Sequence, residues 1–68
     1  MFSLVELIRR MREFEKLGIK STDALHISSA VQANSSYFIT VDKGILNKKN
    51  LIRDIKICNP IEFIEEQE

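Results

Sequence analysis

Apolar residues recur at helical spacing in the first part of the chain. Ser3 and Glu6 match a capping box at the start of this segment, and Gly18 fits the left-handed position that follows a helix. The pattern predicts a helix over residues 3–17, with Ile19 folding back onto it. The apolar positions form one stripe at 3.6 residues per turn: Leu4, Leu7, Ile8, Met11 and Phe14.

A second, slimmer apolar face follows. Ser21 and Thr22 are both good N-cap residues, and Asn34 suits the left-handed residue after a helix. We therefore expect a helix over residues 22–33, whose small residues permit close approach to a sheet. Its apolar face comprises Ala24, Ile27, Ala30 and Val31.

Two short segments have the composition of strands. Residues 37–41 (Tyr-Phe-Ile-Thr-Val) are nearly continuous in apolar character, which is typical of a parallel strand covered on both faces. Residues 55–58 (Ile-Lys-Ile-Cys) predict a second strand. Between them, Asp42-Lys43-Gly44 breaks the first strand, and residues 45–49 are expected to form a short helix.

The last segment carries a strong helix start. Asn59 is a good N-cap, Pro60 fits the first helical position, and Glu62 completes a capping-box spacing. The sequence predicts a helix over residues 60–66, with Phe63 and Ile64 on its buried side.

The predicted order of helix, helix, strand, short helix, strand, helix indicates an α/β fold. Strands joined by such a crossover are parallel. A two-stranded parallel sheet has two open edges and little core, and parallel sheets occur almost only within larger covered sheets. We therefore interpret residues 1–68 as a single partial domain. It is expected to belong to a larger α/β domain or to complete its sheet with a second chain or a second copy.

Composition narrows the function classes only slightly. Ten basic and ten acidic side chains cancel, so no global field indicates a nucleic-acid partner. The single cysteine, Cys58, is expected to be a buried small apolar residue, which fits a reducing compartment. No apolar run approaches the ~20 residues of a membrane span, and the N-terminus lacks a secretory-signal pattern. We expect a cytoplasmic chain with no membrane partner.

Two acidic residues are candidates for a shared site. A helix that leads into a strand packed beneath it runs antiparallel to that strand. Asp23 and Asp42, nineteen positions apart, should therefore lie at one sheet edge, where open α/β sheets bind ligands. Paired carboxylates repel unless a cation lies between them, and Mg²⁺ or Mn²⁺ suits an all-oxygen site. Thr40, on the same side as Asp42, could hold a metal-bound water or a phosphate oxygen. Such a site suits phosphodiester hydrolysis.

Each of these residues also has a structural interpretation. Asp23 could stabilise the helix dipole, and Asp42 could form the turn before Lys43. His26 is expected to be buried and hydrogen-bonded rather than to act as a ligand. The segment after Asp42 has a local positive bias that would suit a nucleic-acid backbone, although solvated lysines explain it equally well. Its basic residues are Lys43, Lys48, Lys49, Arg53 and Lys56.

Three motifs together resemble a known family. Ser-Thr-Asp-Ala-Leu-His-Ile-Ser-Ser-Ala, then Tyr-Phe-Ile-Thr-Val-Asp-Lys-Gly-Ile-Leu, then Ile-Cys-Asn-Pro-Ile-Glu-Phe-Ile are similar to the C-terminal half of a PIN domain. The resemblance covers residues 16–64. It implies an α/β fold with a central parallel sheet and an Mg²⁺- or Mn²⁺-dependent ribonuclease. Some members are the toxins of toxin–antitoxin pairs, so RNA is the implied substrate and an antitoxin a candidate partner. Asp23 and Asp42 match two acidic metal-site positions, and Thr40 matches the hydroxyl residue beside the second.

The chain also departs from the family pattern. The family's site uses a further aspartate at the end of the first strand and a glutamate on an early helix, and this chain lacks that first half. Glu6 is too close to Asp23 in sequence and already fits a capping role. The leading hypothesis is a truncated or fragmentary PIN-like ribonuclease, weakly active or inactive alone. The alternative is a non-catalytic interaction or dimerisation module that uses the apolar face of the first helix and the open sheet edges.

Overall fold

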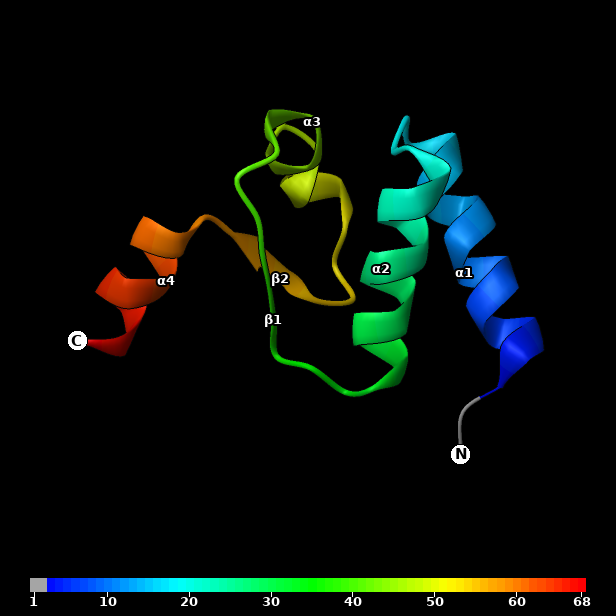
Figure 1. Cartoon of the computed structure of the whole chain (residues 1–68), viewed down its shortest axis with the longest axis horizontal. Helices are drawn as coiled ribbons and strands as arrows, with labels where there is room; N and C mark the ends of the chain where they lie inside the picture. Colours follow the sequence, from blue (N-terminus) through cyan, green and yellow to red (C-terminus); the bar gives the residue numbers. More distant parts are fainter. Residues whose placement is uncertain (1–2) are drawn as a thin grey trace.

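The chain forms a helical hairpin that packs beside a small parallel sheet (Figure 1). This computed structural model describes residues 3–68, so the first two residues of the expected 1–68 domain lie outside it. Helices α1 (Leu4–Lys16) and α2 (Ser21–Gln32) make the hairpin. Strands β1 (Tyr37–Ile39) and β2 (Lys56–Cys58) make the sheet. The mixed α/β class and the incomplete parallel sheet are confirmed.

The ends of α1 follow the local sequence signals. The Ser3 hydroxyl accepts a hydrogen bond from the Glu6 backbone N–H at 3.3 Å. At the other end Gly18 has φ +93°, and the N–H of Ile19 donates to the Phe14 carbonyl at 3.4 Å. This is the expected Schellman ending, in which a left-handed residue lets the chain satisfy the last helical carbonyls. It places Ile19 in the core.

Helix α2 begins earlier than predicted. Lys20, not Ser21 or Thr22, is the N-cap, and its side chain makes no capping hydrogen bond. The Ser21 hydroxyl donates to the Glu15 carboxylate on α1 instead, so a contact between helices replaces the predicted local cap. At the C-terminal end, Asn34 has φ +59°, as predicted.

The two strands are parallel, and both are shorter than predicted. Phe38 pairs with Ile57 in register, and the last bond between the strands runs from the Thr40 N–H to the Cys58 carbonyl at 3.0 Å. Helix α4 (Pro60–Gln67) begins two residues after β2 ends, so Val41 has no strand residue left to pair with. Within residues 3–68, each strand has a neighbouring strand on one edge only.

The connection between the strands contains α3 (Lys43–Leu46) and a 3₁₀ helix, η1 (Lys49–Leu51). The predicted bounds of 45–49 were wrong because Asp42 caps this helix and starts it two residues earlier. The capping box at Asn59 is complete, with Glu62 N–H donating to Asn59 at 2.7 Å and Asn59 N–H donating to Glu62 at 3.0 Å. Helix α4 therefore starts at Pro60, as predicted.

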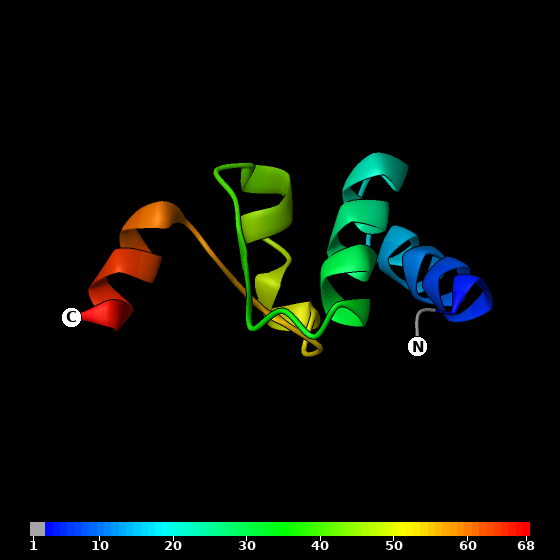
Figure 2. The same cartoon turned by 60° about the horizontal axis from the view of Figure 1, so that its bottom comes forward.

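The core lies between α2 and the sheet, with α1 against the outer side of α2 in both views (Figures 1 and 2). Ile27 is its centre and is fully buried. Cys58 is buried, as expected. The core residues come from the hairpin, from α3 and the segment after η1, and from β2: Phe14, Ile19, Ala24, Ile27, Ile45, Ile52, Ile55 and Ile57.

The far side of the sheet is poorly covered. Helix α4 contains no buried residue, and Ile64, expected on its buried side, is 59% exposed. Ile39 and Val41 are exposed, so the prediction of a strand covered on both faces was wrong. Leu4 and Ile8 on α1 are also exposed. Among residues 3–68, none of the helices is long and apolar enough to cross a membrane.

Candidate functional site

Asp23 and Asp42 line the same small pocket, of about 70 Å³. Asp23 is the third residue of α2 and Asp42 directly precedes α3. The expected meeting of helix N-terminus and strand end is therefore confirmed. Buried Ile19 and Ile45 also line the pocket, and they fix the hairpin turn against α3.

The two carboxylates have different local roles. One carboxylate oxygen of Asp42 accepts the Ile45 N–H at 3.2 Å and so caps α3, which leaves its second oxygen without a hydrogen bond from residues 3–68. Asp23 is half-buried, and its carboxylate accepts no hydrogen bond from that part of the chain. Neither aspartate forms an ion pair with a described residue.

Thr40 stands behind the pocket rather than in its wall. Its hydroxyl oxygen accepts a hydrogen bond from the Asp42 N–H at 3.1 Å, and Thr40 is not among the lining residues. This bond fixes the backbone turn that places Asp42 at the pocket. Thr40 is thus placed to orient Asp42 within this chain.

Two other residues considered from the sequence lie away from the pocket. His26 is exposed rather than buried, so that expectation was wrong. Glu6 is bound by Arg9 on the surface of α1, at 2.7 Å. The hydrogen bond and charge of Arg9 hold the pKa of Glu6 below its ordinary value of 4.5. Glu6 therefore has a local partner and takes no part in the candidate site.

The donor set fits a weak site for a hard divalent cation. Carboxylate oxygens are the ligands that Mg²⁺ prefers, and Mg²⁺ is commonly held by only one or two carboxylates while it keeps several waters. Within residues 3–68, however, no group of three or more His, Cys, Asp or Glu side chains is placed to hold a metal ion. Asp23 and Asp42 are therefore a pair of carboxylates without a third such ligand among residues 3–68.

Two glycines shape the pocket, and the sequence patterns did not assign them to it. A Cβ on Gly44 would lie 3.0 Å from a carboxylate oxygen of Asp42, so the glycine gives that carboxylate room. A Cβ on Gly18 would lie 2.9 Å from Nζ of Lys48. Gly18 was predicted only as a helix end, because a close approach across the fold leaves no periodic signal. Lys20 also lines the pocket.

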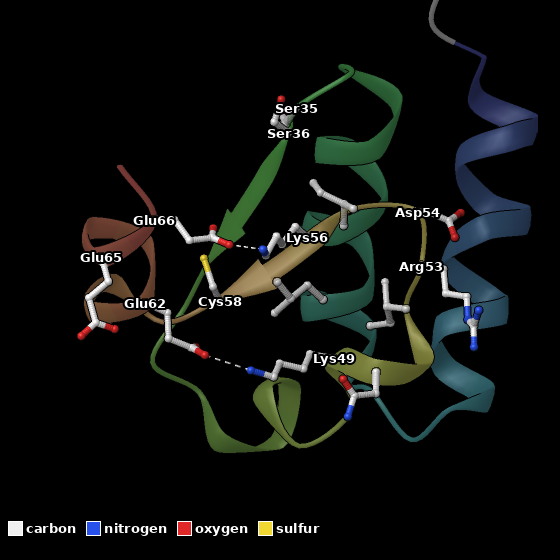
Figure 3. A pocket seen from close by; sticks show the side chains of 14 residues that line it. Ser35, Ser36, Lys49, Arg53, Asp54, Lys56, Cys58, Glu62, Glu65 and Glu66 are labelled. Carbon is white, nitrogen blue, oxygen red and sulfur yellow. Dashed lines mark hydrogen bonds and ion pairs between the residues drawn. The ribbon is translucent and has the colours of Figure 1, made fainter. Parts of the chain in front are cut away.

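A larger groove, of about 900 Å³, lies along β2 and beneath α4 (Figure 3). Two ion pairs cross it, Lys49 with Glu62 at 3.1 Å and Lys56 with Glu66. The Asn59 N–H and Lys49 lower the pKa of Glu62 below 4.5. Because these charges satisfy one another, they tie α4 to η1 and to β2. The small pocket is the better candidate for chemistry, since it brings together two carboxylates that form no ion pair within residues 3–68.

Comparison with known proteins does not add a family. No protein family model, no curated protein and no solved structure matches this chain. The resemblance to PIN domains therefore rests on the motifs at Asp23, Asp42 and Asn59.

Proposed function

We propose that this chain is part of a PIN-like, metal-dependent ribonuclease and that it is weakly active or inactive alone. The observation that carries the proposal is the shared pocket of Asp23 and Asp42, in which neither carboxylate has a cationic partner among residues 3–68. The order and spacing of the three motifs support it.

Electrostatics explains why two such carboxylates favour a cation. Like charges within one small pocket raise each other's free energy, and a bound cation removes that cost. Lys20 lines the pocket but forms no ion pair there with either aspartate. Asp23 and Asp42 would hold Mg²⁺ or Mn²⁺, and Thr40 would keep Asp42 in place.

The reaction would be hydrolysis of an RNA phosphodiester, in which water adds to phosphorus and the ester P–O bond breaks as the leaving oxygen takes a proton. A bound divalent cation supplies charge stabilisation and a more acidic water. This chain's residues supply two anionic ligands and their orientation. The remaining ligands would come from a second chain, a second copy or a missing first half of the domain, and each would also extend the sheet.

A Mn²⁺ titration followed by NMR tests the site. Paramagnetic broadening is expected first at the amides of Asp23, Thr40 and Asp42, and Asp23→Asn is expected to weaken it. Glu13→Gln is the matched control, because Glu13 pairs with Arg9 on the far helix. Broadening centred on any other region, or unchanged in Asp23→Asn, would overturn the proposal.

A second candidate function is an interaction module, and a separate observation favours it. Val5 is 77% exposed on α1 and Val41 is 76% exposed beside the unpaired edge of β1. Apolar surface next to an open strand edge is a common place for a second chain to pair. Light scattering distinguishes the two ideas. A tight dimer that does not respond to Mn²⁺ would favour the module, whereas a stable monomer would count against it.

A further inference from the structure

One lysine that the proposed metal site does not use approaches Gly18, a residue of the pocket wall. Lys48 follows α3 in sequence, and it is half-buried. Its Nζ lies 2.9 Å from the position that a Cβ on Gly18 would occupy, and its Cε lies 3.2 Å from that position. Gly18 lines the pocket of Asp23 and Asp42 and Lys48 does not, so the ammonium of Lys48 lies against one residue of the pocket wall without entering the pocket.

The glycine makes this approach feasible. A heavy atom 2.9 Å from a Cβ is closer than packed side chains tolerate, so any other residue at position 18 would displace the end of Lys48. The φ of +93° excludes most side chains on backbone grounds as well. Gly18 therefore both ends α1 and opens a place for the ammonium.

The ammonium of Lys48 also lacks a partner. It forms no ion pair with any residue from 3 to 68 and no side-chain hydrogen bond with them. By contrast, Lys49 and Lys56 are bound by glutamates of α4. Of these three lysines, Lys48 alone keeps its charge free for a ligand.

We propose that Lys48 is the phosphate-contacting residue of the site and binds a backbone phosphate of RNA beside Gly18. The inference rests on the proposed function for its substrate class. One divalent cation only neutralises the two carboxylates, so the negative charge of a substrate phosphate still favours a cation from the protein nearby, and a lysine supplies it as a point charge. Lys20, which lines the pocket, adds positive charge on the same side.

Binding of a fluorescent ten-uridine oligoribonucleotide to the full chain, measured at several salt concentrations, tests this role. Loss of one phosphate contact on a single strand is expected to reduce the slope of log affinity against log salt by about 0.7. If the wild type and the variant bind equally at 1 M salt, this difference in slope makes the variant bind roughly eightfold more weakly than the wild type at 50 mM salt. Lys48→Met should show both effects while keeping the length of the side chain, and Lys48→Arg should restore the slope.

Lys43→Met is the matched control, because Lys43 is an exposed lysine in the same connection between the strands, at the start of α3. It is expected to change the slope by less than half as much. Equal effects of the two lysine variants, or an unchanged slope in Lys48→Met, would overturn the inference. The second outcome would leave Lys48 with the structural role of a cation near the C-terminal end of α1.

The two proposals fail separately. Mn²⁺ broadening at Asp23 and Asp42 reports the metal site without RNA, and oligonucleotide binding without Mn²⁺ reports Lys48 alone. Loss of the first with retention of the second rejects the metal site and keeps the phosphate contact. The reverse pattern rejects Lys48 and keeps the metal site.

Discussion

The ring of Tyr37 meets the ring of Phe63 edge to face, with centroids 5.1 Å apart and planes at 84°. This contact joins β1 to α4 on the side of the sheet opposite the hairpin (Figure 1). Two ion pairs reinforce it across the groove beside β2. Because α4 buries no residue fully, the aromatic pair is its main apolar attachment.

Phe63→Ala is expected to loosen α4 from the sheet. The loss of the aromatic pair and of a half-buried ring should lower the free energy of unfolding by about 1–2 kcal/mol. Amide hydrogen exchange should rise throughout α4 and leave α2 unchanged. Ile64→Ala, at an exposed position of the same helix, should stay within about 0.5 kcal/mol. Similar effects of the two variants would contradict this view of α4.

Ser28→Ala is expected to stabilise the protein. Ser28 is fully buried in α2, and its hydroxyl has no hydrogen-bond partner in the part of the chain that the structure describes. An unsatisfied buried hydroxyl costs about 1–3 kcal/mol, and alanine removes it without adding volume. Urea unfolding should therefore give a gain of about 1 kcal/mol.

Ser29→Ala provides the comparison for Ser28, because Ser29 is only half-buried in the same helix. It should gain no more than the small difference in helix propensity between serine and alanine. If Ser29→Ala stabilises as much as Ser28→Ala, the buried hydroxyl is not the cause.

Two substitutions of Asp42 should separate its capping role from its charge. Asparagine is as good an N-cap as aspartate, so Asp42→Asn should retain stability, whereas Asp42→Ala should lose about 1 kcal/mol. Both variants remove the negative charge, so both should weaken Mn²⁺ broadening at Asp23. Unimpaired Mn²⁺ binding in Asp42→Asn would show that the carboxylate only caps α3.

Acidification should weaken the start of α4. The Asn59 N–H, followed by Lys49, holds the pKa of Glu62 below 4.5. A carboxyl group whose pKa is lower in the folded state stabilises that state above its unfolded pKa. Its contribution should therefore be complete above about pH 4.5 and disappear as the pH falls through the lower, folded value.

Amide exchange at Asn59 as a function of pH measures this effect. Glu62→Gln should flatten the profile in that acidic window. Glu65→Gln, which removes a carboxylate that makes no ion pair within residues 3–68, should leave it unchanged. If the pH dependence of amide exchange at Asn59 is unchanged in Glu62→Gln, another titrating group causes it.

Local signals predicted the parts of the fold that depend on neighbouring residues. Ser3, Gly18 and Asn59 each end or start a helix through bonds within four residues, so sequence spacing was sufficient. Ser21 was mistaken for a cap because its hydroxyl is taken by Glu15 of the preceding helix. That contact depends on the angle of the hairpin, which no local pattern encodes.

The candidate site was predicted to a similar extent. Topology alone placed Asp23 and Asp42 together, since a helix and the strand that follows it run in opposite directions. The approach of Lys48 to Gly18 was not predicted, because it joins the end of α1 to the connection between the strands. Likewise, the exposure of Ile39 depends on which elements pack against the sheet. The composition of the strand does not determine whether such elements are present.

The shared pocket has a consequence for the kinetics of the chain. Asp23 belongs to the hairpin, whose contacts are local, whereas Asp42 belongs to the connection between strands whose paired residues, such as Tyr37 and Lys56, are nineteen positions apart. Local contacts form early in folding and distant ones late. The carboxylates therefore approach each other only when the two parts dock. We expect a cation bound between them to slow unfolding more than it changes the folding rate, to the extent that docking follows the folding transition state.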